Sequence, residues 1–183
     1  MQLERRQLLR GALALTGAAS ALGASPALAF PGADVRRLDF ANLHTGEKLS
    51  VAYWERGAYV PDALSAVNKV LRDFRNNEVH AIEPRLLDVL AALSGKVGRQ
   101  APFQVISGYR SPATNAALHA RSDGVAAHSL HMDGKAIDIR IAGVELTHLR
   151  HSALGLGLGG VGYYPTSDFV HVDVGRVRRW SGT

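Results

Sequence analysis

The chemistry and the fold of this chain are decided by one stretch, Ser129-Leu130-His131-Met132-Asp133-Gly134-Lys135-Ala136-Ile137-Asp138. His131 falls at the end of a predicted loop, and Asp138 lies in a segment, residues 135–142, that alternates like a strand. Gly134 allows a sharp turn between them, because glycine adopts backbone conformations that other residues avoid. We therefore expect both side chains to point into one cleft.

A second histidine follows in a similar segment, Asp168-Phe169-Val170-His171-Val172-Asp173. His131, Asp138 and His171 offer three ligands and leave a fourth position open, which distinguishes a catalytic zinc site from a structural one. The chain has no cysteine, so a thiolate site and a cysteine nucleophile are excluded. It has eight histidines, however, and a pair of histidines near carboxylates also arises by chance. Spacing alone leaves both interpretations open.

The first 29 residues have the pattern of an export signal. Arg5 and Arg6 form a twin-arginine pair, an apolar run rich in Ala, Gly and Leu follows, and small residues precede a cut before Phe30. The alternative is a membrane anchor, for which the apolar run is short, because a span needs roughly 20 residues. We expect export to the periplasm by the twin-arginine route, and no membrane span once the signal is removed.

Residues 30–183 are expected to form one domain, since domains usually run to about 100–200 residues. The net charge is +5 and the isoelectric point is about 9.9, a balance that nucleic-acid-binding proteins also show. Outside the signal, Arg176, Arg178 and Arg179 form what we interpret as a basic tail. Because the sequence lacks a basic stripe interleaved with aromatic residues, we expect no nucleic-acid partner. A mildly basic surface suits a polyanionic cell wall.

Hydrophobic spacing predicts an α+β domain around a small antiparallel sheet flanked by helices. An N-terminal hairpin, residues 35–43 and 48–55, and two amphipathic helices, residues 61–76 and 83–97, come first. Ser111 and Pro112 open a further helix, as its N-cap and first residue. The other predicted elements are strands over 103–107, 135–142, 161–164 and 169–174 and a helix over 145–154.

The motif Ser129-x-His131-x-x-Gly134-x-Ala136-x-Asp138, followed by Asp168-x-x-His171, resembles the zinc peptidases of the D-Ala-D-Ala carboxypeptidase and murein endopeptidase clan. That clan shares its fold with the zinc domain of hedgehog proteins. The most similar branch is the murein endopeptidase K family, whose members also carry segments like residues 107–111 and 169–173. The resemblance implies a hedgehog-like zinc peptidase domain over residues 30–183, with its metal-site core at about 100–180. It also implies that His131, Asp138 and His171 bind Zn²⁺.

The same resemblance implies that Asp168 is the general base, which takes a proton from the attacking water and passes it to the leaving amine. Residues 168 and 171 would face opposite sides of an ideal strand. Asp168 must therefore lie on a loop or bulge just before that strand. Asp173 shares a face with His171 and is the competing candidate, although we interpret it as orienting a ligand histidine by a hydrogen bond.

Further residues are candidates for contact with the substrate. Arg110 is expected to stabilise the oxyanion or to bind a substrate carboxylate, the alternative being a salt bridge to a neighbouring acid. Ser129 is expected to orient its loop or to contact the substrate, and no elbow of the kind that presents a nucleophilic serine surrounds it. Tyr109 and His128 are expected to contact the substrate or to support the ligands. Some relatives carry a helper histidine where this chain has Phe169, and His128 is the available substitute.

The resemblance thus implies a zinc-dependent murein endopeptidase that hydrolyses peptide cross-links of the cell wall, with peptidoglycan stem peptides as its partner. A D,D- or L,D-carboxypeptidase acting on stem peptides is one alternative. A zinc-bearing domain that binds the cell wall without cleaving it is another. The sequence identifies neither the bond that is cut nor the oligomeric state.

Overall fold

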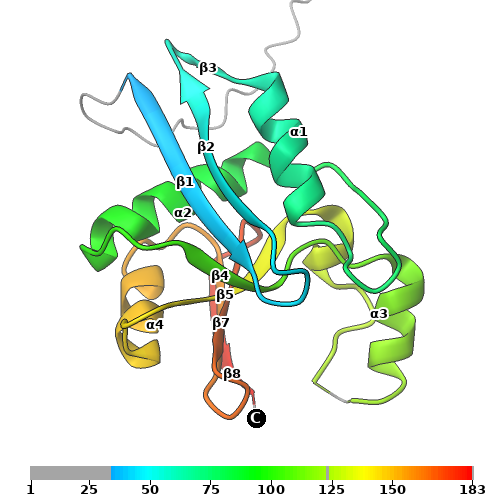
Figure 1. Ribbon diagram of the computed structural model, residues 1–183. Helices are drawn as coiled ribbons and strands as arrows, with labels where there is room; N and C mark the ends of the chain where they lie inside the picture. The colour runs from blue at the N-terminus through cyan, green and yellow to red at the C-terminus, as the bar shows by residue number, and fades with distance from the viewer. Residues whose placement is uncertain (1–33, 123, 183) are drawn as a thin grey trace, which may run out of the picture.

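The computed structural model describes residues 34–122 and 124–182. The predicted signal, residues 1–29, therefore lies outside the described residues. Within the described part, the strands form one eight-stranded sheet in the order β3-β2-β1-β4-β5-β7-β6-β8, with helices packed against it (Figure 1). The strands are β1 (Val35–Asn42), β2 (Lys48–Glu55), β3 (Ala58–Tyr59), β4 (Phe103–Ser107), β5 (Ala136–Ile141), β6 (Gly160–Tyr164), β7 (Phe169–Asp173) and β8 (Arg178–Ser181).

The α+β class is confirmed, but the expected small antiparallel sheet is wrong in two respects. The N-terminal hairpin β1–β2 continues the same sheet, because β1 pairs with β4 in parallel register, Phe40 opposite Phe103. At the other edge β8 pairs with β6, again in parallel. Both parallel pairings join segments far apart in the chain, which local alternation does not reveal. The interpretation of Arg176, Arg178 and Arg179 as a basic tail is therefore wrong, since the last two begin strand β8.

Four α-helices accompany the sheet: α1 (Pro61–Val70), α2 (Pro84–Val97), α3 (Pro112–His119) and α4 (Leu146–Leu154). Proline stands in the first turn of the first three, where its missing N–H costs nothing. Ser111 caps α3 as expected by accepting a hydrogen bond from the backbone N–H of Thr114 at 3.2 Å. The helix predicted over 61–76 ends early, because the carbonyl of Leu71 accepts from the Tyr109 N–H at 2.7 Å and ties the chain to the segment after β4.

Alternation along the central strands separates a helix-covered face from a site-bearing face. Ile137, Ile139 and Ile141 of β5 are buried in the same core as Leu149 and Ala153 of α4. Successive side chains of a strand point to opposite faces. Asp138, between two of these isoleucines, consequently lies on the face away from α4, and so does His171, its partner across β7.

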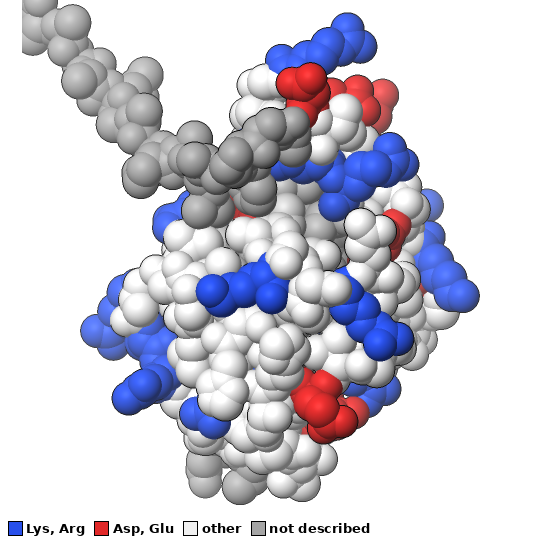
Figure 2. Space-filling model, turned by 90° about the vertical axis from the view of Figure 1, so that its left-hand side faces the viewer, with Lys and Arg blue, Asp and Glu red and all other residues white. Residues whose placement is uncertain are grey.

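Charged side chains are scattered over one face of the molecule. On the face shown in Figure 2, Lys and Arg side chains are dispersed among uncharged residues and form no continuous stripe. Among the described residues, no helix has both the length and the apolar composition that a membrane crossing requires.

Candidate metal centre

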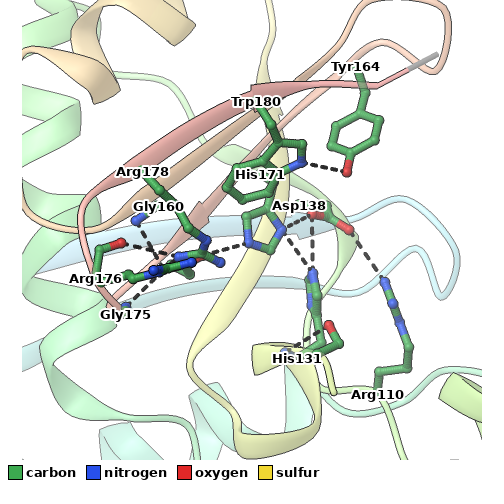
Figure 3. Close-up of polar contacts among 12 residues, drawn as sticks. Arg110, His131, Asp138, Gly160, Tyr164, His171, Gly175, Arg176, Arg178 and Trp180 are labelled. Atoms are coloured by element: carbon green, nitrogen blue, oxygen red, sulfur yellow. Dashed lines mark hydrogen bonds and ion pairs between the residues drawn. The ribbon is translucent and has the colours of Figure 1, made fainter. Parts of the chain in front are cut away.

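The three predicted ligands meet on the site-bearing face of the sheet. His131 Nε2 lies 3.2 Å from Asp138 Oδ1 and 3.2 Å from His171 Nδ1, and the last two atoms are 2.8 Å apart. All three side chains are buried. Figure 3 shows them converging on one point, His171 and Asp138 from the sheet and His131 from below.

His131 is held by a short 3₁₀ helix, η1 (Leu130–Asp133). Ser129 caps it, its hydroxyl accepting from the His131 N–H at 3.4 Å. Gly134 then turns the chain into β5 with φ 66°, and a Cβ there would lie 2.2 Å from the Ala81 carbonyl oxygen, so only glycine fits. His131 Nδ1 lies 2.7 Å from the carbonyl oxygen of Gly108. A carbonyl only accepts, so Nδ1 carries the proton and Nε2 presents its lone pair to the cluster.

His171 is oriented from its other side by Asp173. Its Nε2 lies 3.1 Å from Asp173 Oδ2, which directs Nδ1 toward Asp138. The fully buried Asp173 carboxylate also accepts from both terminal nitrogens of Arg178, at 2.7 and 3.0 Å, and from the backbone of Gly160 and Gly175. Both oxygens of Asp173 are therefore engaged, one with His171 and Arg178 and the other with Arg178 and the backbone, and neither is left free to act as a base.

The charges within the cluster are strongly coupled. Burial opposes ionisation of Asp138, but the neighbouring His131 and His171 outweigh it and hold the pKa of Asp138 well below its usual range. Burial lowers the pKa of His131, which favours its neutral form. Burial also acts against the charged form of Asp173, yet hydrogen bonds from His171, Arg178 and the backbone lower the pKa of this carboxyl. Burial lowers the pKa of His171, but hydrogen bonds from its ring to Asp138 and Asp173 outweigh this effect and raise the pKa. The site therefore presents a carboxylate at Asp138 and a neutral imidazole at His131, the forms that bind a metal, and His171 loses a proton when a metal binds.

The donor set fits a zinc ion. Two imidazole nitrogens and one carboxylate oxygen form a ligand set that zinc takes in catalytic sites. Ligands about 2.0–2.1 Å from a tetrahedral ion are about 3.3 Å apart, close to the observed 3.2, 3.2 and 2.8 Å. No other group of three or more ligating side chains of this kind occurs in the described part of the chain.

Arg110 lies beside the cluster, where it lines the cleft. Its terminal nitrogens are 3.6 Å from Asp138 Oδ2 and 3.3 Å from the amide oxygen of Asn115. The side chain is almost fully buried, and its Nε has no partner among the described residues. Burial lowers the pKa of this guanidinium, though an arginine stays charged. Both interpretations of Arg110 from sequence are thus compatible with its position, since it pairs with an acid at the edge of the cleft.

The cluster opens into a cleft of about 830 Å³. His128 and Ser129, the residues predicted at the mouth of the site, are among its lining residues, and His128 is exposed. Tyr109 does not line it. Its ring is buried and stacks on His80, and its hydroxyl donates a hydrogen bond to Glu78 at 2.7 Å. Burial together with that hydrogen bond raises the pKa of Tyr109 to about 12. Tyr109 therefore supports the loop that carries Arg110 rather than the cleft wall.

Asp168 occupies the predicted turn immediately before β7, with φ 54°. Its carboxylate forms an ion pair with Arg140 of β5, and the side chain is 58% exposed. Its neighbours Ser167 and Phe169 line the cleft, whereas Asp168 does not. The placement on a turn agrees with the expectation, while the carboxylate is directed to Arg140.

Arg178, Trp180 and Tyr164 also belong to the site and were not predicted. Arg178 and Trp180 lie two residues apart on the same face of β8, and they pair with Gly160 and Gly162 of the neighbouring strand β6. Gly162 in turn pairs with His171 of the adjacent strand β7. The signal that points to them is the pairing of two glycines in one strand with two large side chains in another, and it is visible only once the register of β8 is known.

Comparison with known proteins identifies a single family for this chain. Residues 31–180 match the family described as peptidoglycan L,D-endopeptidase MepK. The chain belongs to the MepK family. It is 43% identical over 174 residues to the peptidoglycan L,D-endopeptidase MepK of Escherichia coli (strain K12), covering 93% of this chain and 96% of the relative. It is 47% identical over 148 residues to the probable peptidoglycan L,D-endopeptidase MepK of Haemophilus influenzae, covering 80% of each chain. As a MepK-family protein the chain is a peptidase.

Proposed function

We propose that this protein is a zinc-dependent endopeptidase that hydrolyses L,D peptide bonds in the cross-links of peptidoglycan. The observation that carries the proposal is the buried His131–Asp138–His171 cluster on the floor of a large cleft. The names of the relatives support the substrate and the L,D stereochemistry of the bond.

His131 Nε2, Asp138 Oδ1 and His171 Nδ1 would hold the zinc. When bound, the ion supplies a Lewis acid for the scissile carbonyl and for the attacking water. Gly108 and Asp173 fix the two imidazole rings from behind, which keeps the metal-facing nitrogens aligned before the ion arrives. Ser129 supports this arrangement by capping η1, and His128 lies at the mouth of the cleft, where the substrate enters.

Asp168 is the proposed general base. It takes a proton from the attacking water and passes it to the leaving amine, a task that needs a carboxylate within hydrogen-bonding distance of both. Its position three residues before His171 and on the turn that borders the cleft supports this role. The role requires the carboxylate to rotate from Arg140 into the cleft, beside Ser167 and Phe169.

Arg110 is proposed to stabilise the negative charge that develops on the scissile carbonyl oxygen. Two features support this: the guanidinium lines the cleft beside Asp138, and its Nε has no partner among the described residues. A buried arginine held in place before the reaction provides such stabilisation without reorganisation. Tyr109, behind it, would position this segment through its bond to Glu78.

We further propose that the enzyme acts in the periplasm and reaches it by the twin-arginine route. The proposal rests on the pattern of residues 1–29, with the peptidase domain over 30–183, and on a substrate that lies outside the cytoplasmic membrane. A fusion of residues 1–29 to a reporter that matures only after folded export would test it, with Arg5 and Arg6 replaced by lysine as the control.

The proposed activity is tested with purified dimeric muropeptides. One carries an L,D cross-link between two diaminopimelates, the other a D,D cross-link from D-Ala to diaminopimelate. The zinc-loaded protein is expected to cleave the first and spare the second, with loss on chelation and recovery on addition of zinc. Mass spectrometry of the products identifies the bond. Binding to sacculi without release of any fragment would instead support the non-catalytic alternative.

A further inference from the structure

An aromatic wall closes one side of the cleft next to the metal ligands. We define it by Trp180 of β8, Tyr164 of β6 and Phe169 of β7, all of which line the cleft. The ring centroid of Trp180 lies 5.1 Å from that of His171, and Tyr164 stacks on Phe169 at 4.5 Å. All three rings are half-buried, so each retains surface that a ligand can cover.

The wall is built into the sheet by two glycines. A Cβ at Gly162 would lie 2.6 Å from the Trp180 ring, and one at Gly182 would lie 2.2 Å from the Tyr164 ring, whereas real Cβ contacts essentially never fall under 3.0 Å. The absence of a side chain at Gly162 lets the indole pack directly on β6, and its absence at Gly182 leaves room for the Tyr164 ring. Trp180 Nε1 then donates to the Tyr164 hydroxyl at 2.9 Å, which fixes the two rings to each other (Figure 3).

Polar side chains line the cleft as well. Arg110, His128 and Ser129 lie among its lining residues, so the cleft offers hydrogen-bonding groups in addition to aromatic faces. A substrate that crosses the metal ligands therefore meets aromatic faces with one part and hydrogen-bonding groups with another. Aliphatic groups bind to such faces because both surfaces leave water.

We propose that the aromatic wall is a subsite for the aliphatic chain of the amino acid that directly flanks the scissile bond, and this rests on the function proposed above. One extended residue spans about 3.3–3.6 Å. A wall whose nearest ring is 5.1 Å from a ligand imidazole is thus within reach of the flanking residue. In an L,D cross-link that residue is a diaminopimelate, whose methylene groups match the apolar surface. The sugars are attached farther along the stem.

The test compares W180A and W180F with the unaltered, zinc-loaded full chain on two substrates. One is a synthetic sugar-free peptide with two diaminopimelates joined from L-centre carboxyl to D-centre amine. The other is the same cross-link carrying its disaccharides. For W180A we expect KM to rise about tenfold or more on both substrates, a size typical of a lost aliphatic contact, with kcat within about threefold. W180F keeps a ring and is expected to fall between the two. W54F, a substitution of the only other tryptophan, serves as the matched control.

Three outcomes overturn the proposal. A rise in KM confined to the disaccharide-bearing substrate assigns the wall to the sugar. A loss confined to kcat, or a loss of bound zinc, shows that Trp180 only positions His171. An unchanged KM shows that the wall does not contact the substrate.

A binding measurement separates failure of the proposal from failure of the proposed function. In the W54F variant Trp180 is the single tryptophan, so its fluorescence reports on the wall alone. If the peptide is not cleaved but changes that fluorescence saturably, the subsite stands and the assigned reaction is wrong. If the peptide is cleaved and the fluorescence does not respond, the reaction stands and the subsite is wrong.

Discussion

Two buried aspartates, Asp88 of α2 and Asp138 of β5, show how differently the same side chain is used in this molecule. The Asp88 carboxylate accepts from Arg36 at 2.8 Å, from Tyr53 at 3.1 Å and from Tyr59 at 2.6 Å. These partners close around it between the helix and strands β1–β3. Asp138 instead meets two histidines and faces a cleft.

The two sites differ in how far the protein itself supplies the hydrogen-bond partners that their buried polar groups need. Both oxygens of Asp88 accept hydrogen bonds from donors of the protein itself, so this carboxylate needs no ligand and is structural. Ser107 of β4 lies opposite Asp138 in the sheet. Its hydroxyl and the Nε of Arg110 are buried without a hydrogen-bond partner among the described residues. A buried polar group without a partner is costly. This loss of stability is expected where a bound ligand supplies the missing hydrogen-bond partners.

Removing Asp138 should have the largest effect on this comparison. For D138A we expect loss of stoichiometric zinc and a fall in cross-link hydrolysis of at least about 10³-fold, because one of three ligands is gone. Zinc content by mass spectrometry under native conditions and muropeptide cleavage are the two measurements. Retention of zinc at wild-type affinity would show that Asp138 is not a ligand.

Replacing the proposed base should cost less, because the metal stays. D168A is expected to lower kcat by about 10²–10⁴-fold, the usual contribution of general acid–base catalysis, with zinc affinity unchanged. R140A is the matched control, since it removes the partner of Asp168 and leaves the carboxylate in place. Full activity of D168A with zinc bound would make the assignment of the base wrong.

Asp88 provides the opposite test, on stability. For D88A we expect the free energy of unfolding to fall by about 3 kcal/mol, because a nearly buried arginine and two tyrosine hydroxyls lose their acceptor. Urea denaturation measures the change. Zinc affinity and kcat should match the wild type, and a metal defect in a folded D88A protein would break the distinction between the two aspartates.

The smallest effect is expected at Arg178, which acts on the metal only through Asp173 and His171. R178A should weaken zinc binding by about tenfold, the lower end of the range for residues that orient a ligand. Competition with a chromogenic chelator measures it. R179A, on the same strand but exposed, is the control and should bind zinc normally, while equal losses in both variants would indicate a general effect of charge.

Local pattern was sufficient for much of this structure. The spacing of His131 and Asp138 around Gly134 predicted their convergence, and Ser111-Pro112 predicted the start of α3, because both depend on short-range backbone geometry. Strand β4 was predicted over its full length, since its alternation is clean. In each case the determining contacts lie within a few residues.

Long-range pairing explains what the sequence did not reveal. The strand character of Arg178 and Trp180 depends on two glycines of β6, and the size of the sheet depends on the parallel pairing of β1 with β4. The direction of the Asp168 carboxylate depends on Arg140, 28 residues earlier in the chain. Strand pairing and side-chain orientations of this kind are set by tertiary contacts, which local sequence patterns do not reveal.

One row across the sheet has a consequence for folding. Ser107, Asp138, His171, Gly162 and Trp180 lie opposite one another on strands β4, β5, β7, β6 and β8. A slip of one residue between neighbouring strands would turn every displaced side chain to the opposite face. An ion that needs Asp138 and His171 on one face is thus bound only by correctly registered strands. Because zinc would bind only the correctly paired sheet, its binding would stabilise that sheet relative to misregistered forms. Metal binding would thus favour the same strand register that the active site requires.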